Sequence, residues 1–252
     1  MRLVQLSDIH FGSLFRQDVY DLLVDEINNE IKPDVLIITG DLTDDGLLFQ
    51  FKKIHEEIKK FECQNKIILP GNHDYRHTGY LLFKKFFSSK QIFELGNVIV
   101  LTLGTARPER DEGEVGHRQN LWMEKTLAKY PDHVKIIAMH HHLIGIPDTG
   151  SDKIIILDAG DTLRSCLQSS VNLVLCGHKH RPWIWKLGPL KIAYAGTASS
   201  NRFRGFFENS YNVINIDANK KIELEIKIVG GEKFPLDDLV EKYTSFKDSI
   251  LF

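Results

Sequence analysis

The sequence contains little of what a disulfide-linked, secreted or membrane-spanning protein needs. Its three cysteines, Cys63, Cys166 and Cys176, are widely spaced and odd in number, so we expect small buried thiols and no disulfide framework. The acidic Asp8 leaves no room before it for the apolar stretch of a signal peptide. No apolar run approaches the roughly 20 residues of a membrane helix. These absences predict a soluble cytoplasmic protein that does not bind a membrane.

A block of like charge is also absent. Thirty-two Lys and Arg residues against 34 Asp and Glu residues leave a formal net charge of −2. A protein that coats nucleic acid neutralises many phosphates with basic residues, so a nucleic acid partner is not expected. The balance allows a small anionic substrate held by a few local positive groups. It leaves open whether the chain forms a homo-oligomer.

Apolar residues alternate between two periods along the chain. Short apolar runs predict strands at residues 3–6, 35–39, 66–69, 98–103, 134–139 and 173–176. Helical stripes predict helices near residues 18–31, 47–58, 81–87, 119–130 and 161–168. Mainly strands follow, at residues 183–187, 192–195, 211–216 and 222–229. Such alternation is typical of βαβ units, so we expect an α/β fold with a largely parallel sheet.

We expect one main domain, residues 1–230, followed by a C-terminal helical tail, residues 231–252. The 252 residues, of which 42% are apolar, are enough to bury a full core. The tail carries an apolar stripe that includes Leu236, Leu239 and Val240, which predicts a helix packed on the domain or on a partner subunit.

Five predicted strands end in side chains that metals bind. The clusters are Asp8 with His10, Asp41, Asn72 to Asp74, His140 to His142, and His178 with His180. Ligand sites in open α/β sheets gather at the carboxyl ends of strands, so these clusters are expected to converge on one cleft. Mixed imidazole and carboxylate ligands suit Mn, Fe and Zn.

In this order the clusters resemble the motifs of a known family. Asp8-x-His10, Gly40-Asp41, Gly71-Asn72-His73-Asp74, the His after Met139 and Gly177-His178-Lys179-His180 look like the five blocks of the calcineurin-like metallophosphoesterases. The resemblance covers roughly residues 1–217. It implies a four-layer αββα sandwich, in which two mixed β-sheets are flanked by helices and the metal site lies at the carboxyl ends of the strands.

The resemblance also implies roles for individual residues. Seven side chains would hold two metal ions, Mn, Fe or Zn: Asp8, His10 and His180 on one ion, Asn72, His140 and His178 on the other, and Asp41 on both. His141 is the alternative to His140. His73 resembles the residue that steadies the transition state or protonates the leaving oxygen, with Asp74 orienting it.

The implied activity is hydrolysis of a phosphate ester by a hydroxide held between the two ions. Residues 197–202, 211–212 and 113–122 resemble the branch of cyclic-nucleotide and small-molecule phosphodiesterases. A phosphodiesterase acting on a small organic or cyclic nucleotide diester is therefore the leading interpretation. A phosphomonoesterase, a nuclease of the same fold and a non-catalytic metal-binding scaffold stay open. Arg202, Arg107 and His141 are candidate substrate contacts, because a guanidinium matches a phosphate well.

Overall fold

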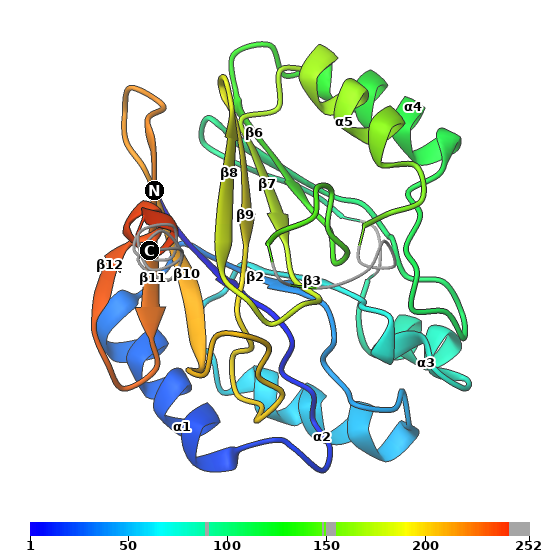
Figure 1. Ribbon diagram of the computed structural model, residues 1–252, viewed down its shortest axis with the longest axis vertical. Coiled ribbons are helices and arrows are strands. Elements are labelled where there is room, and N and C mark those ends of the chain that lie inside the picture. The colour runs from blue at the N-terminus through cyan, green and yellow to red at the C-terminus, as the bar shows by residue number, and fades with distance from the viewer. Residues whose placement is uncertain (89–90, 148, 150–154, 242–252) are drawn as a thin grey trace, which may run out of the picture.

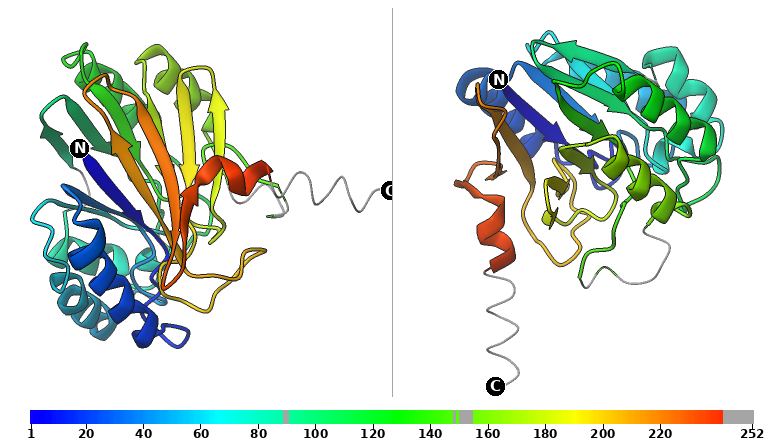
Figure 2. Two further views of the ribbon diagram at one scale, coloured as in Figure 1. Left: turned by 90° about the vertical axis from the view of Figure 1, so that its left-hand side faces the viewer. Right: turned by 90° about the horizontal axis from the view of Figure 1, so that it is seen from above.

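The computed structural model describes residues 1–88, 91–147, 149 and 155–241 of the chain. Two six-stranded sheets lie face to face, and helices cover the outer face of each (Figures 1 and 2). The predicted four-layer αββα sandwich with two mixed sheets is therefore confirmed. None of the helices described has the length and apolar character that a membrane crossing requires.

The first sheet has the strand order β12-β11-β10-β1-β2-β3. Its strands are β1 (Arg2–Leu6), β2 (Val35–Thr39), β3 (Lys66–Leu69), β10 (Ser210–Ile216), β11 (Ile222–Ile228) and β12 (Lys233–Pro235). β1, β2 and β3 are parallel to one another, whereas β10 to β12 add antiparallel strands. The carboxyl ends of the three parallel strands therefore meet at one edge.

The second sheet has the order β4-β5-β6-β7-β9-β8. Its strands are β4 (Ile92–Leu95), β5 (Val98–Thr102), β6 (Val134–Ala138), β7 (Leu173–Cys176), β8 (Trp183–Leu187) and β9 (Leu190–Tyr194). β5, β6, β7 and β9 are parallel, and β4 and β8 are antiparallel edge strands.

The helices divide between the two outer layers. They are α1 (Gln17–Asp25), which continues as a π-helical segment (Glu26–Ile31), α2 (Leu48–Lys59), α3 (Gly79–Phe86), α4 (His117–Leu127) and α5 (Ala159–Gln168). The first three lie outside the first sheet, and α4 and α5 lie outside the second (Figure 1). A short 3₁₀ turn (His73–Tyr75) follows β3.

Three apolar clusters explain why the strand sequences are so rich in β-branched residues. One lies between the sheets and includes Ile37, Ile136 and Ile214, while the other two fill the space beneath the helices. All five residues of β2 are buried. A strand covered on both faces needs apolar side chains at every position, which gives a continuous run instead of an alternating one.

Two strands were not predicted from the sequence, β4 and β12. Both lie at or near a sheet edge and are only partly buried, so the apolar signal of their sequences is weak. The predicted helical tail, residues 231–252, thus includes a strand that pairs with β11. Leu236, Leu239 and Val240 then pack against the inter-sheet core, and residues 242–252 lie outside the described part. Division of the chain at residue 230 stays a prediction.

Candidate metal centre

Loops at the carboxyl ends of β1, β2, β3, β6 and β7 bring the predicted ligands together. Five of the seven have a left-handed backbone: φ is 54° at Asp8, 49° at His10, 52° at Asp41, 78° at His178 and 53° at His180. This conformation is uncommon for residues other than glycine, and such positions cluster at functional sites. The backbone turns sharply at these residues, so each side chain is aimed back over the strand ends.

Two glycines allow the loops to approach one another. A Cβ atom on Gly71 would lie only 2.1 Å from Oδ1 of Asp41, and one on Gly177 would lie 1.9 Å from Oγ of Ser7. Real Cβ atoms do not come that close to other atoms, so both positions require glycine. The Gly-Asn-His-Asp and Gly-His-Lys-His motifs thus begin with glycine for a steric reason.

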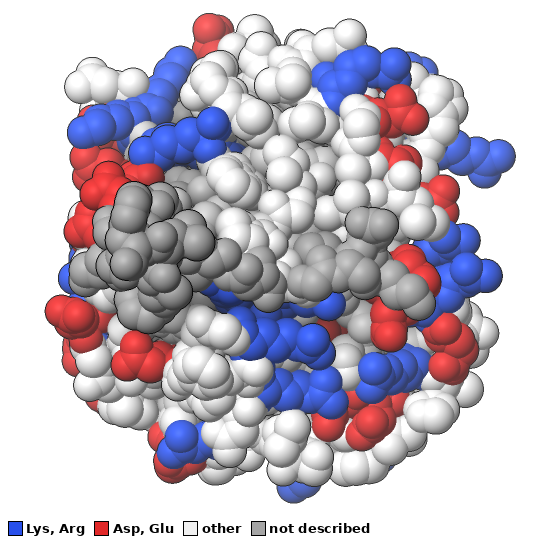
Figure 3. Space-filling view, in the orientation of Figure 1, with Lys and Arg blue, Asp and Glu red and all other residues white. Residues whose placement is uncertain are grey.

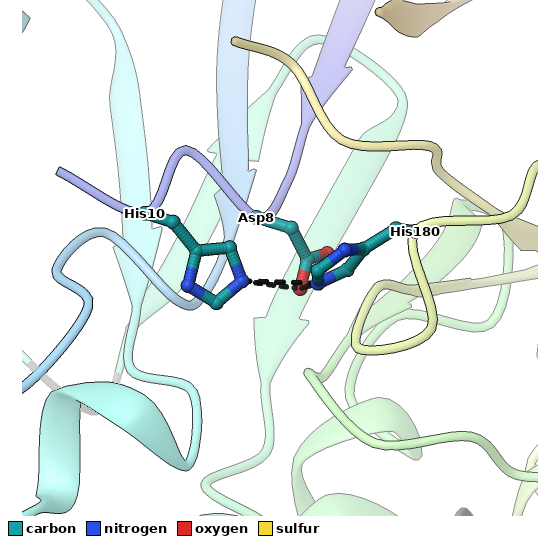
Figure 4. Close-up of side chains that lie close together, drawn as sticks. All are labelled: Asp8, His10 and His180. Carbon is teal, nitrogen blue, oxygen red and sulfur yellow. Dashed lines mark hydrogen bonds and ion pairs between the residues drawn. The ribbon is translucent and has the colours of Figure 1, made fainter. Parts of the chain in front are cut away.

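One group of ligands consists of Asp8, His10 and His180. Nε2 of His10 lies 3.0 Å from Nε2 of His180, and Oδ1 of Asp8 lies 3.3 Å from the same atom of His180 (Figure 4). The three side chains come from the β1 loop and the β7–β8 loop and point toward a common centre. All are buried.

A second group consists of Asn72, His140 and His178, with Asp41 beside it. Oδ1 of Asn72 lies 3.1 Å from Nε2 of His140 and 3.0 Å from Nδ1 of His178. Oδ2 of Asp41 is 3.3 Å from Nε2 of His140 and 3.7 Å from Nε2 of His10. The Asp41 carboxylate therefore lies between the two groups, where the bridging ligand of a pair of ions would be.

These groups fit metal ions by the chemistry of their donor atoms. Oδ1 of Asp8 is buried and has no hydrogen-bond partner. Nδ1 of His140 contacts the carbonyl oxygen of Thr39 at 2.8 Å, and Nδ1 of His180 contacts that of Arg202. A ring that donates through Nδ1 presents the lone pair of Nε2, which is the usual arrangement of a histidine ligand. Lone pairs that face one another in a buried site are costly unless a cation lies between them.

Burial and neighbouring charge set the protonation of the ligands. Burial lowers the pKa of His10 to about 4 and that of His178 well below its usual range, so both rings are neutral at pH 7. Burial opposes ionisation of Asp41, but His140, His73 and His10 together outweigh it and hold the pKa of this carboxyl well below its usual range. Burial also disfavours the charged form of His140, yet Asp41 raises its pKa to about 9. A bound ion would displace that proton.

The predicted catalytic pair His73 and Asp74 lies beside Asp41, but its contacts differ from the expectation. The Asp74 carboxylate accepts hydrogen bonds from the backbone N–H groups of Leu42, Thr43 and Gly71. Among the described residues, no hydrogen bond or ion pair joins Asp74 to the His73 ring, and the expectation that Asp74 orients this ring stays a prediction. Burial, together with Asp41, raises the pKa of Asp74 to about 7. Asp74 joins the loops after β2 and β3.

Asp44 contacts the His73 ring, which the sequence did not indicate. Nδ1 of His73 donates to the backbone oxygen of Asp44 at 2.7 Å, and the Asp44 carboxylate lies 3.7 Å from the same nitrogen. That carboxylate is also 3.5 Å from Nδ1 of His10. Its contact with His10, and then Arg202, lowers the pKa of Asp44 against the effect of burial. Asp44 lies in a turn, where no pattern in the sequence marks it, so it was not predicted.

The two candidate ligands of the His triplet are separated by the structure. His140 reaches Asp41 and Asn72, whereas the His141 ring contacts Oγ of Thr105 at 2.8 Å and the backbone oxygen of Asp111 at 3.0 Å. His141 therefore anchors the long loop that follows β5, and its ring lies beside that of His178 with the centroids 4.6 Å apart. Its roles as alternative ligand and as substrate contact lack support from these contacts.

The two candidate arginines differ as well. Nη2 of Arg202 lies 3.1 Å from the Asp44 carboxylate, which places this guanidinium beside the centre. Arg107 pairs with Glu114 at 3.1 Å within its own loop. A contact between Arg107 and a substrate stays a prediction.

A further residue that the sequence analysis missed is Asp111. Nδ2 of Asn72 donates to Oδ1 of Asp111 at 3.1 Å, so the amide is held with its oxygen toward His140 and His178. The side chain of Asp111 is 70% exposed and lies on a loop, where no periodic pattern marks it.

Comparisons with known proteins show which sequences and folds this chain resembles. A sequence model of the calcineurin-like phosphoesterase family matches residues 1–182. A probable glycerophosphodiester phosphodiesterase, GpdQ, from Arcobacter nitrofigilis is 27% identical over 202 residues. The alignment covers 72% of this chain and 72% of the relative. The 3′,5′-cyclic adenosine monophosphate phosphodiesterase CpdA of Escherichia coli K12 is 27% identical over 72% of this chain and 70% of its own.

The fold is also found among solved structures. The purple acid phosphatase PPD1 from yellow lupin seeds superimposes with a TM-score of 0.73 over 93% of this chain and 52% of its own, at 14% identity. A likeness at this level of identity concerns the arrangement of the strands and helices alone.

Proposed function

Because the chain belongs to the calcineurin-like phosphoesterase family, we propose that it hydrolyses a small organic or cyclic nucleotide phosphodiester. It is a metal-dependent phosphoric ester hydrolase of a family that uses two metal ions. The observation that carries the proposal is the position of Asp41, whose carboxylate lies between two groups of buried nitrogen and oxygen donors. The names of the relatives, both phosphodiesterases, favour a diester.

The proposed ligands divide between two positions. Asp8, His10 and His180 would hold one ion, and Asn72, His140 and His178 would hold the other, with Asp41 on both. When bound, such ions neutralise phosphoryl oxygens and activate a water at neutral pH. The donor set accepts Mn, Fe or Zn.

His73 is the proposed acid for the leaving oxygen. Its Nδ1 is engaged by the backbone oxygen of Asp44, so Nε2 is the nitrogen left to face a substrate. Its backbone N–H donates to Oδ1 of Asp41 at 2.8 Å, which fixes the ring next to the proposed bridging ligand. The Arg202 guanidinium, beside Asp44, is suited to hold a non-bridging oxygen of the phosphate.

The test is hydrolysis of bis(p-nitrophenyl) phosphate and p-nitrophenyl phosphate by protein stripped with a chelator and reloaded with Mn. Metal-dependent turnover that favours the diester supports the proposal. Activity on the monoester alone would identify a phosphomonoesterase. Bound metal without turnover of either compound would favour the scaffold, and cleavage of DNA or RNA in preference to small diesters would favour the nuclease. A cytoplasmic location and a homo-oligomer stay predictions.

A further inference from the structure

The loop between β9 and β10 is tied to the metal centre at several points. The backbone oxygen of Arg202 accepts a hydrogen bond from Nδ1 of His180, and the Arg202 guanidinium lies beside the Asp44 carboxylate. Gly205 has a φ of 71° and lies against Arg181, the residue that follows His180. A Cβ at Gly205 would be 3.1 Å from Nη1 of Arg181. The middle of the loop thus lies against the segment that carries His180.

This loop carries an exposed aromatic ring, Phe207, and a partly buried one, Phe203, which follows Arg202 directly. The side chains of Phe203 and Phe207 lie with ring centroids 6.3 Å apart at 59°. Phe207 is 76% exposed, the highest exposure among the large apolar residues of the described chain. Phe206, between them in sequence, packs partly against the inter-sheet core and anchors the loop. The fold therefore holds the Phe207 ring in solvent, beside the partly buried Phe203 ring.

Two basic residues flank these features in the sequence. Lys179 lies between the proposed ligands His178 and His180, and the exposed Arg204 follows Phe203 on the loop. Neither side chain has an ion-pair partner within the part of the chain that the structure describes. Figure 3 shows Lys and Arg side chains near the centre of this face, where Figure 1 places the loops after β7 and β9. These two cationic side chains are therefore suited to attract an anionic ligand.

We propose that Phe203 and Phe207 form a stacking platform for the base of a nucleotide whose phosphate binds at the metal centre, with Lys179 and Arg204 attracting the phosphate. The inference rests on the proposed function and narrows its substrate class from small diesters to nucleotides. Aromatic rings bind bases through their faces with little regard to which base is present. The aliphatic alcohol group of a small organic diester has no aromatic face, so it would gain little binding free energy from the two rings. Phe207 is the principal contact, because its ring is the more exposed.

The test measures binding and does not depend on turnover. Protein reloaded with Mn is titrated by calorimetry with adenosine 5′-monophosphate and, separately, with ribose 5-phosphate, which lacks only the base. We expect the nucleotide to bind about 5- to 100-fold more tightly. Phe207→Ala should remove most of this preference and leave the affinity for ribose 5-phosphate unchanged. Phe203→Ala should reduce the preference to a smaller extent.

Leu187→Ala is the matched control. Leu187 is also an exposed apolar residue, but it lies at the β8–β9 turn, at the opposite end of the sheet from the ligands. Equal affinity for the two compounds in the wild type would overturn the platform, as would a preference that survives in Phe207→Ala. If the base preference is found and no phosphodiester is hydrolysed, the proposed function fails and the platform stands. If bis(p-nitrophenyl) phosphate is hydrolysed without a base preference, only the platform fails.

Discussion

Asp44 contacts the His73 ring through both its backbone and its side chain. The backbone oxygen of Asp44 accepts a hydrogen bond from Nδ1 of His73 at 2.7 Å, and the Asp44 carboxylate lies 3.7 Å from the same nitrogen. A ring whose Nδ1 is engaged in this way presents Nε2 outward. The same carboxylate contacts Nδ1 of His10 at 3.5 Å. One acidic side chain thus supports both a proposed metal ligand and the proposed proton donor.

Replacing this carboxylate tests its support of His73. We expect Asp44→Asn to retain the metal and to lower kcat by about 10-fold or more, a part of what an acid catalyst contributes. Asp45→Asn is the control, because the Asp45 carboxylate contacts Gln50. Steady-state kinetics with metal analysis would measure both. A kcat equal to that of the wild type would show that the carboxylate has no such role.

Removing the His73 ring tests the proton donor itself. His73→Ala should keep both ions, since the ring is not needed for either proposed ligand set, and should lose about 10²–10⁴-fold in kcat. The loss should be smaller for a diester with a good leaving group, because p-nitrophenolate departs with little help from an acid. Equal losses for good and poor leaving groups would contradict this role.

The contact between Asp111 and Asn72 predicts an effect on metal affinity. Asp111→Ala frees the amide of Asn72 to rotate, and we expect the affinity for the ion near His140 to fall by about 10-fold. Asp111→Asn keeps a side-chain oxygen at the same place and should bind metal nearly as well as the wild type. Calorimetric titration of the stripped protein with Mn separates the two variants. An unchanged affinity in Asp111→Ala would rule out a positioning role.

Two glycines give a paired test of loop packing. Gly71→Ala would place a Cβ 2.1 Å from the Asp41 carboxylate, so it should displace this ligand and impair metal binding. Gly160→Ala, within α5, meets no atom within 4 Å and should stabilise the protein by about 0.5–1 kcal/mol. Thermal unfolding and metal titration report the two effects. Normal metal binding by Gly71→Ala would show that the loops can separate without harm.

The three free cysteines should differ in reactivity. Burial raises the pKa of Cys166 to about 12 and raises that of Cys176 as well, and both lie in the core. Cys63 is half-buried, and burial raises its pKa less far. We expect 5,5′-dithiobis(2-nitrobenzoic acid) to modify Cys63 first, faster as the pH rises and the thiolate fraction grows, and the other two only after unfolding. Modification of all three at one rate in the native state would contradict this order.

The expectations that succeeded rest on local signals. Val35–Thr39 predicts a strand because each of its side chains must be apolar to be covered on both faces, and Asp41 follows at its end. Because parallel strands end at the same edge of a sheet, the sequence alone could bring Asp8, Asp41 and Asn72 to one place. His178 follows β7 in the second sheet and joins them because the two sheets lie face to face. The division of the ligands between two ions is implied by the family resemblance and stays a prediction.

The sequence by itself determined the fold class and the strand ends that carry the candidate metal ligands, since strand periodicity and ligand type are properties of short segments. Only the tertiary structure decided that His140 faces Asp41, that Asp44 supports His73, and that Asp111 holds Asn72. These pairs join different loops, and a hydrogen bond of that kind depends on how two backbones meet in space. Neighbouring residues in sequence, such as His140 and His141, point to different partners because the backbone turns between them.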